Sequence, residues 1–412
     1  MPQLTPTRNS DLPHSVDSFD CLVDGLNYAA RGETGCNFYT GRGELLHSLP
    51  YSKLREDAIQ LALRLVRHGL PRGGRVAIVA ETSPDFMRVF FACQYAGLLP
   101  VPMPMPTTLG GRDAHISRLH MMMKSSGAVA GVASEDLIGD VIAAAEDLSS
   151  VKLVATPAQL FALPAEGGEL RPLGIGDMCY IQYSSGSTRF PRGIMISQRS
   201  IISNCRAITV HGLQIRPDDR CVSWLPLYHD MGLVGFFITP MLAQISTDYV
   251  GTSDFARRPL IWLKIISENK GTLSFSPTFG YDLCERRAKN GADAGYDLSS
   301  WRVAGIGAEM IRADILDKFA GKFAPNKFRP SAFVPSYGLA ESTLAVSFAP
   351  LDGGYDVDRI DKRQFSTAGR AVPPKGNGST PARNVREFVN CGKPMPGHSI
   401  EIRDNEGKIL GE

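Results

Sequence analysis

The sequence lacks a dominant charge and lacks any long hydrophobic run. Its 412 residues include 44 Lys and Arg against 42 Asp and Glu, a formal net charge of +2. Because neither sign prevails, the composition indicates neither nucleic acid nor an anionic membrane surface as a partner. The longest apolar stretches, 89–103 and 231–243, are too short or too interrupted to cross a bilayer. The sequence therefore predicts no integral membrane segment.

Closely spaced cysteines are also missing. The eight cysteines are scattered, and no two have the C-x-x-C spacing, so a zinc site is not expected. A disulfide framework is not expected in so long a chain, which favours a reducing compartment. The first twenty residues are polar and lack the apolar core of a secretory signal. Together these absences predict a cytoplasmic protein.

What is present from residue 75 onward is an alternation of strand-like and helix-like segments. RVAIVA (75–80) has the composition of a buried strand, and 84–96 is typical of a helix with Ser83 as N-cap and Pro84 in the first turn. The alternation continues to about residue 320. Since 412 residues exceed what one core usually serves, these βαβ units predict an α/β fold with two doubly wound subdomains whose sheets are mostly parallel.

After about residue 345 the pattern changes. Residues 350–386 carry Gly, Pro and charged positions without a clear period, whereas 398–412 alternate around an Asp-Asn-Glu-Gly turn. The second pattern is typical of a β-hairpin, so the end of the chain is predicted to be part of a small β subdomain. The sequence stops as the second hairpin strand begins, and we therefore expect it to be a piece of a longer protein.

One segment has the composition of a phosphate-binding loop. A predicted strand (178–183) is followed by SSGST (184–188) and then by Pro-Arg-Gly (191–193). A glycine among four hydroxyl residues makes a loop whose N–H and O–H groups can surround polyphosphate oxygens, and Arg192 adds a positive charge. An ordinary Ser/Gly-rich surface loop has the same composition, so composition leaves both interpretations open. The Walker A pattern occurs nowhere in the chain.

The same segment, SSGSTRFPRG, resembles the phosphate-binding signature of the adenylate-forming superfamily, with Arg192 at a position where lysine is usual. Other segments, 298–325, 333–350 and CGKPMPG (391–397), are similar to one branch of that superfamily, the fatty acyl-AMP ligases. By this resemblance the chain is identified as the large N-terminal domain of such a ligase. Four further superfamily motifs follow in order: WLPLYHDMGL (224–233), SFSPTFGYDLC (274–284), GAE (307–309) and YGLAES (337–342).

The resemblance implies roles for individual residues. His229, Glu341 and Thr188 would be catalytic, with Glu341 also holding Mg²⁺ beside the phosphates of ATP. The implied ATP-binding residues are Ser184, Ser185, Gly186, Ser187, Thr188, Arg192, Gly193, Gly307, Ala308, Glu309, Tyr337 and Gly338, and the implied substrate-binding residues are Asp230, Met231, Gly232 and Phe279.

Each of these roles has a purely structural alternative. A lone Glu at a helix start is usually a partner of the helix dipole, and Tyr337 could be a core aromatic residue. Asp230 could orient the His229 ring or cap the helix that follows. The apolar run 232–243 is typical of a buried helix, and it can also line a tunnel for a fatty acyl chain.

The resemblance implies that the protein activates a medium- or long-chain fatty acid with ATP to give acyl-AMP and pyrophosphate. The acyl group would pass to the phosphopantetheine arm of an acyl carrier protein in a polyketide, peptide or lipid pathway. An insertion over 350–386 favours this branch, whose insert is associated with poor use of coenzyme A. A fatty acyl-CoA synthetase is the alternative enzyme, and a non-catalytic acyl- or nucleotide-binding module is the alternative of another class. Without a C-terminal domain, the 412 residues are expected to be a weak or inactive catalyst by themselves.

These expectations divide the chain into four parts. They are an N-terminal extension (1–30), an α/β subdomain with the phosphate loop (31–211), a second α/β subdomain with the acyl and adenine pocket (212–345), and an insertion with a partial β subdomain (346–412).

Overall fold

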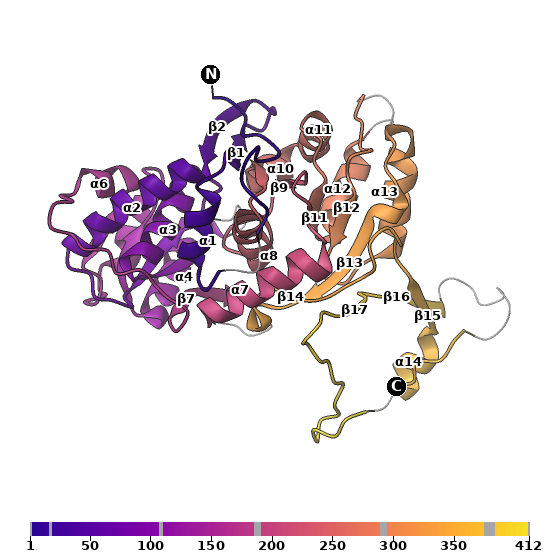
Figure 1. Ribbon diagram of the computed structural model, residues 1–412. Coiled ribbons are helices and arrows are strands. Elements are labelled where there is room, and N and C mark those ends of the chain that lie inside the picture. The colour runs from indigo at the N-terminus through magenta and orange to yellow at the C-terminus, as the bar shows by residue number, and fades with distance from the viewer. Residues whose placement is uncertain are drawn as a thin grey trace.

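The computed structural model describes residues 2–15, 19–106, 110–184, 191–288, 295–374 and 384–410. Figure 1 shows two groups of helices and strands, an N-terminal one in indigo and purple and a second one in brown and orange. A C-terminal part in yellow lies beyond the second group. The predicted α/β fold with mostly parallel sheets is confirmed.

The N-terminal group contains a parallel four-stranded sheet with the order β4-β3-β5-β6. Its strands are β3 (Arg75–Val79), β4 (Leu99–Met103), β5 (Ala128–Val132) and β6 (Leu153–Ala155). The helices of this group are α1 (Leu22–Ala29), α2 (Tyr51–Arg67), α3 (Pro84–Ala96), α4 (Gly111–Ser126), α5 (Ile138–Ala145) and α6 (Pro157–Ala162).

Helix α3 shows how local sequence sets these elements. The Ser83 hydroxyl accepts a hydrogen bond from the Phe86 N–H at 3.3 Å, and Pro84 occupies the first turn, as predicted. The helix ends at Gly97, whose φ of 74° is a left-handed conformation that glycine adopts without strain.

The second group is built on a nine-stranded sheet with the order β17-β14-β13-β12-β11-β9-β10-β1-β2. The six strands from β13 to β1 are parallel, and antiparallel strands flank them on both sides. The strands are β1 (Gly35–Tyr39), β2 (Leu45–Pro50), β9 (Arg220–Ser223), β10 (Ser246–Val250), β11 (Leu273–Ser276), β12 (Val303–Ile306), β13 (Phe333–Gly338), β14 (Ala345–Phe348) and β17 (Lys393–Pro394).

The helices of this group follow the strands along the chain. The α-helices are α7 (Gln198–Ala207), α8 (Asp230–Leu233), α9 (Thr239–Leu242), α10 (Thr252–Arg257), α11 (Leu260–Glu268), α12 (Thr278–Arg287) and α13 (Ala313–Phe323). Shorter segments are the π-helices η1 (Ile208–Gly212) and η2 (Val234–Ile238) and the 3₁₀ turns η4 (Ala324–Asn326), η5 (Pro330–Ala332) and η6 (Ala340–Ser342).

Strand pairing crosses the boundary expected at residue 211. Strands β1 and β2 lie within the range 31–211, yet β1 pairs in parallel with β10 and so extends the second sheet. The reason is non-local: β1 is separated from β10 by about 200 residues, and no periodicity in either segment indicates its partner.

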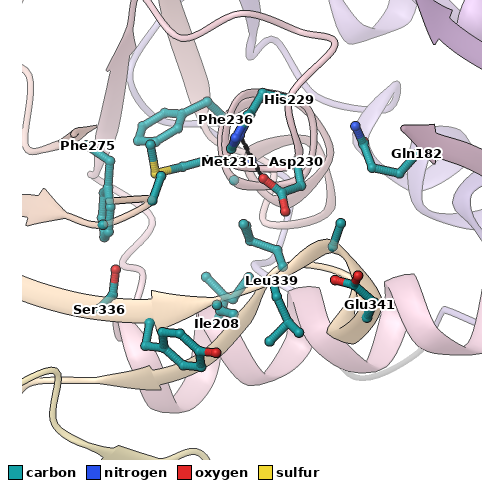
Figure 2. A pocket seen from close by; sticks show the side chains of 18 of the residues that line it. Gln182, Ile208, His229, Asp230, Met231, Phe236, Phe275, Ser336, Leu339 and Glu341 are labelled. Carbon is teal, nitrogen blue, oxygen red and sulfur yellow. Dashed lines mark hydrogen bonds and ion pairs between the residues drawn. The ribbon is translucent and has the colours of Figure 1, made fainter. Parts of the chain in front are cut away.

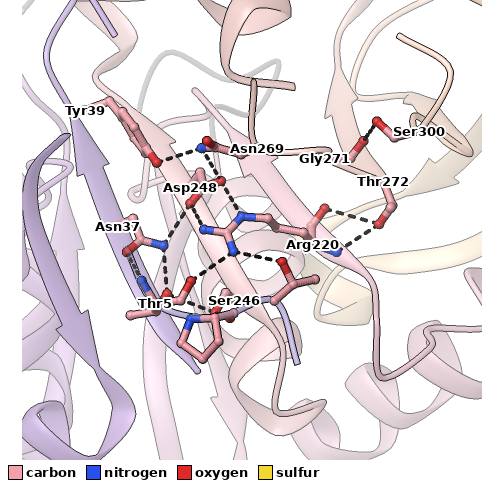
Figure 3. Close-up of polar contacts among 12 residues, drawn as sticks. Thr5, Asn37, Tyr39, Arg220, Ser246, Asp248, Asn269, Gly271, Thr272 and Ser300 are labelled. Carbon is pink, nitrogen blue, oxygen red and sulfur yellow. Dashed lines mark hydrogen bonds and ion pairs between the residues drawn. The ribbon is translucent and has the colours of Figure 1, made fainter. Parts of the chain in front are cut away.

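A buried ion pair joins the middle of the large sheet to the N-terminal segment (Figure 3). Two guanidinium nitrogens of Arg220 on β9 donate to the two carboxylate oxygens of Asp248 on β10, each at 2.7 Å. Asn37 on β1 also donates to Asp248, at 2.9 Å, and a third Arg220 nitrogen donates to the Thr5 carbonyl at 3.1 Å. Because both charges are paired and hydrogen-bonded, they can be buried among the strands.

One aromatic cluster joins the two groups, and another lies inside the second group. Phe90 and Phe91 of α3 pack edge-on against Phe237 of η2 at 6.0 and 5.6 Å, so the apolar run predicted for 232–243 is buried against the first group. In the second cluster, Trp262 and Trp301 lie beneath α12 and α13 and are almost fully buried.

Among the described residues, no helix combines the length and the apolarity that a bilayer crossing requires.

Residues 350–386 have more regular structure than the sequence indicated. Strands β15 (Val357–Asp361) and β16 (Val385–Val389) form an antiparallel pair, and α14 (Lys362–Ala368) follows β15. Helix α14 buries none of its residues, which explains why it leaves no apolar period in the sequence. The side chain of Tyr355 contacts α13 through a 2.5 Å hydrogen bond to Asp317.

The predicted hairpin near the end of the chain is present in the described residues. Arg403 and Ile409 form an antiparallel bridge, and the Asp404 N–H donates to the Lys408 carbonyl at 3.0 Å. Gly407 supplies the left-handed residue of the turn, with φ of 82°.

Candidate active site

A cavity of about 290 Å³ opens at the carboxyl ends of the parallel strands of the large sheet. Phe275 of β11, Gly307 just after β12 and Ser336 of β13 contribute to its wall. Ser184, the last residue of strand β7 (Met178–Ser184), also lines it. Ligands of open α/β sheets bind at this edge, outside the carboxyl ends of the strands. Figure 2 shows the labelled side chains around this space.

The strand that leads into the predicted phosphate loop reaches the cavity. Strand β7 (Met178–Ser184) pairs with β8 (Arg192–Ser197) as an antiparallel hairpin, with Ser184 opposite Arg192. The loop residues Ser185, Gly186, Ser187 and Thr188 lie outside the described residues, so the expectations for them stay predictions. Ser184 lines the cavity, whereas Arg192 and Gly193 do not.

Gln182 connects this hairpin to the segment that carries His229. Its side-chain amide donates to the Tyr228 carbonyl at 2.7 Å, and the residue is 1% exposed. Its amide oxygen has no hydrogen-bond partner among the described residues, and the residue faces the cavity. A buried acceptor without a partner is costly, so a ligand donor or a water is expected there.

His229 and Asp230 form an ion pair at the cavity wall, drawn as a dashed line in Figure 2. The His229 Nδ1 lies 2.7 Å from the Asp230 carboxylate, which also accepts the Met231 N–H at 2.7 Å. Burial lowers the pKa of His229, but the hydrogen bond to Asp230 and its negative charge raise it by more, so the net pKa lies above its ordinary value. Asp230 therefore contacts both the His229 ring and a backbone N–H of the first turn of α8. These contacts are compatible with both predicted roles, orienting the ring and capping the helix.

The apolar end of the cavity is lined from two π-helical segments. Ile208 belongs to η1, with Leu213 just after it, and Phe236 belongs to η2. A π-helical turn widens the backbone and is frequent at functional sites. Phe275 closes this end from the sheet, with its ring centre 5.9 Å from that of Phe236.

The turn after β12 approaches β13 closely. Gly307 lies so near Ser336 that a Cβ atom added to Gly307 would be 2.9 Å from the Ser336 hydroxyl oxygen. The next residue, Ala308, has a left-handed φ of 68°. Both residues line the cavity, whereas Glu309 does not. The Glu309 carboxylate instead accepts the Phe279 N–H at 2.9 Å and so caps the start of α12.

The end of β13 brings Tyr337 and Gly338 to the opposite wall, and the turn that follows brings Glu341. A Cβ at Gly338 would lie 1.9 Å from the Leu344 carbonyl oxygen, so only glycine fits. Tyr337 is 52% exposed, which excludes the alternative of a core aromatic residue. Within the described residues, Glu341 has no ion pair and no side-chain hydrogen bond, and Figure 2 shows its carboxylate beside the cavity.

Nine of the predicted site residues therefore meet at one cavity, although the chain carries them on distant segments. They are Ser184, His229, Asp230, Met231, Gly307, Ala308, Tyr337, Gly338 and Glu341.

Two other predicted residues lie outside the lining for clear reasons. A Cβ at Gly232 would be 2.2 Å from the Pro226 carbonyl, so this glycine serves the packing of α8. Phe279 is 46% exposed and packs edge-on against Trp224.

Sequence reasoning missed several lining residues. Gln182 was recoverable, because it lies two positions before Ser184 on a strand and so shares its face. Phe275, Ser336, Leu344 and Phe348 were not singled out, since they resemble ordinary strand residues.

Comparison with known proteins gives a consistent result. A family model described as AMP-binding enzyme matches residues 40–412. A putative acyl-CoA synthetase of Caulobacter vibrioides is 44% identical over 414 residues, covering 99% of this chain and 70% of that protein. A medium-chain-fatty-acid–[acyl-carrier-protein] ligase, JamA, of Moorena producens is 30% identical over 401 residues, covering 94% of this chain and 66% of that protein.

A solved structure is also similar. It comes from a study of fatty acyl-adenylate ligases from E. coli and L. pneumophila, and it superposes with a TM-score of 0.92 at 46% identity. The match covers 97% of this chain and 71% of the solved chain. The chain thus spans about two thirds to seven tenths of the length of the proteins it matches here.

Proposed function

Because the chain belongs to the AMP-binding enzyme family, we propose that it is the ATP- and fatty-acid-binding part of an adenylate-forming ligase. The reaction joins a medium- or long-chain fatty acid to AMP. A carboxylate oxygen of the fatty acid attacks the α-phosphorus of ATP, the bond to the β-phosphate oxygen breaks, and pyrophosphate leaves. The observation that carries the proposal is a single cavity with a polar end near Ser184 and Glu341 and an apolar end near Phe236 and Phe275.

The polar end suits the nucleotide. Tyr337 offers an exposed aromatic face on which a flat base can lie, and Gly307 and Gly338 line the same cavity. Ser184 stands where the predicted phosphate loop begins. In this proposal the adenine lies against Tyr337, and the phosphates extend towards Ser184 and the loop residues, including Thr188.

The residues at the polar end also fit Mg²⁺. Within the described parts of the chain, no group of three or more His, Cys, Asp and Glu side chains could hold a metal ion by itself. Magnesium bound with ATP usually takes only one or two protein carboxylates, since phosphates and water complete its shell. Glu341 is a carboxylate without a protein partner among the described residues, at the cavity wall. Mg²⁺ bound there would neutralise phosphate charge.

The reaction brings two anions together, so its barrier is lowered mainly by charge neutralisation and positioning. His229 supports both. Its pKa lies above the ordinary value, which favours the protonated ring, and Asp230 holds the Nδ1 side. We assign His229 the role of donating a hydrogen bond to the attacking carboxylate or the α-phosphate oxygen.

The proposal also specifies which molecule accepts the acyl group. We propose that the complete gene product delivers the acyl group to the phosphopantetheine arm of an acyl carrier protein, as the name of the Moorena relative suggests for that protein. The alternative is transfer to coenzyme A, which the name of the Caulobacter relative suggests. The segment β15–α14–β16 supports the first choice, because it matches the expected position of the ligase insert.

The test uses the complete gene product with dodecanoate, ATP and Mg²⁺. Mass spectrometry should detect dodecanoyl-AMP, and a coupled assay should detect an equal amount of pyrophosphate. Adding coenzyme A or a carrier protein in separate reactions then identifies the acceptor. Absence of acyl-AMP with every fatty acid tried would refute the ligase function and leave a non-catalytic binding module.

A further inference from the structure

The side chain of Phe348 stands between the catalytic cavity and a second cavity. It is the last residue of β14 and lines the apolar end of the first cavity. It also lines a neighbouring cavity of about 700 Å³ that lies between Gly212 and the segment after β14. Among the described residues, Phe348 is the one that the two linings share.

The position of the Phe348 ring is held from several sides. Its backbone pairs with Ser336 of β13 and with Lys393 of β17. The ring lies perpendicular to that of Phe275, with 6.3 Å between the centres. On the other side it approaches Gly212 so closely that a Cβ there would be 2.6 Å from a ring carbon. The ring is therefore a fixed partition with little room to turn.

The two cavities differ in chemical character. Ile208, Leu213 and Phe236 make the end of the first cavity apolar. The second cavity carries charged groups, among them Asp352 and Lys393. Burial of an acyl chain in the first cavity contributes favourable binding free energy, because it removes methylene groups from water. The second cavity contributes little, because methylene groups there lie beside charged groups.

We propose that Phe348 determines the length of acyl chain that the site accepts, by closing the end of the acyl-binding cavity. The inference depends on the proposed function, because it assumes that the apolar end holds an acyl chain. Removal of the ring joins the two cavities and lets longer chains extend past β14. Enlargement of the side chain shortens the accepted chain.

The experiment measures binding, so it does not depend on turnover. The probes are non-hydrolysable acyl sulfamoyl adenosines with chains from hexanoyl to octadecanoyl. Dissociation constants are measured by calorimetry for the wild type, Phe348→Ala, Phe348→Trp and the control Phe388→Ala. Phe388 is a half-buried phenylalanine like Phe348, but it packs on Phe365 and lines neither cavity.

Phe348→Ala should bind chains longer than the wild-type optimum about tenfold more tightly than the wild type does, because the wild-type ring excludes methylenes that the variant admits, and a misfit of one methylene costs roughly 10–200-fold. Phe348→Trp should move the optimum to shorter chains, and Phe388→Ala should keep the wild-type profile. Thermal unfolding checks that each variant is folded. If Phe348→Ala does not fold, Phe348→Leu must shift the profile in the same direction.

The experiment distinguishes a failure of the proposed function from a failure of the inference about Phe348. If no acyl sulfamoyl adenosine binds the wild type, the proposed function fails first. If the analogues bind but folded Phe348→Ala or Phe348→Leu keeps the wild-type profile, Phe348 does not set the chain length and the inference is overturned.

Discussion

At the scale of single residues, Asp230 influences the protonation of His229. Asp230 raises the pKa of His229 against the opposing effect of burial. In Asp230→Asn the charge is lost while burial remains, so the pKa of His229 should fall. The protonated fraction then disappears at a lower pH, and the alkaline limb of kcat/KM for acyl-AMP formation should move to lower pH.

The measurement is a pH–rate profile of the complete gene product, together with a proton NMR titration of His229. Asp254→Asn, which removes a half-buried carboxylate that does not line the cavity, is the control. An alkaline limb at the same pH in Asp230→Asn and the wild type would contradict the assigned role of His229.

Glu341 gives a second prediction at this scale. Its carboxylate has no partner among the described residues and is exposed, so Glu341→Ala should change stability by no more than about 0.5 kcal/mol. Acyl-AMP formation should fall on the order of 10²–10³-fold, the range that loss of one charge-stabilising group costs.

The assay is pyrophosphate release at several Mg²⁺ concentrations. Glu268→Ala, which removes another exposed carboxylate, at the end of α11 and outside the cavity lining, should keep the wild-type rate. A wild-type rate in Glu341→Ala would mean that the metal is held elsewhere.

At the scale of elements, the segment β15–α14–β16 bears on the choice between acyl carrier protein and coenzyme A. The Asn390 N–H donates to the Asp356 carbonyl at 2.9 Å, so the two ends of this segment are adjacent. Residues 357–389 can therefore be replaced by a short Gly linker without stretching the remaining chain. If the proposed function is right, this segment hinders the rotation of the C-terminal domain of the complete gene product that builds a coenzyme A site. We therefore expect acyl-AMP formation to persist and acyl-CoA formation to rise when the segment is removed.

Both products are measured in one reaction with dodecanoate, ATP and coenzyme A. Tyr355→Phe is the companion variant, since it keeps the segment but removes the hydrogen bond to Asp317. Efficient acyl-CoA synthesis by the unmodified protein would refute transfer to an acyl carrier protein and favour the fatty acyl-CoA synthetase.

At the scale of the whole molecule, the N-terminal segment is part of the large sheet's support. Asn9 is buried, donates to the Gln244 carbonyl at 3.1 Å and accepts the Glu33 N–H at 2.7 Å. Asn9 also accepts the N–H of buried Thr34 at 3.1 Å. Asn9→Ala leaves this buried N–H without its partner, at a cost of about 1–3 kcal/mol. We expect the thermal midpoint to fall by several degrees.

Differential scanning calorimetry checks this, with exposed Ser10→Ala as the neighbouring control. Equal midpoints for Asn9→Ala and the wild type would show that the hydrogen bonds of Asn9 contribute nothing to the stability of the sheet.

The sequence by itself determined the alternating strands and helices from residue 75 to about 320 and the order of the motifs. Helix α3 follows from Ser83, Pro84 and Gly97, because a cap, a first-turn proline and a left-handed glycine act within a few residues. The alternation from residue 75 determined the parallel α/β fold for the same reason, since its periods are local. The motifs around His229 and Glu341 likewise indicated a site before any geometry was available.

Only the tertiary structure decided which distant residues pair in one sheet or line the same cavity. The pairing of β1 with β10, the orientation of Gln182 and the place of Phe348 between two cavities depend on contacts across long stretches of chain. Such contacts carry a loop-closure cost and leave no period in the sequence. A phenylalanine at the end of a strand has the same local pattern in any sheet, and its partition role exists only because Gly212 and Phe275 meet its ring.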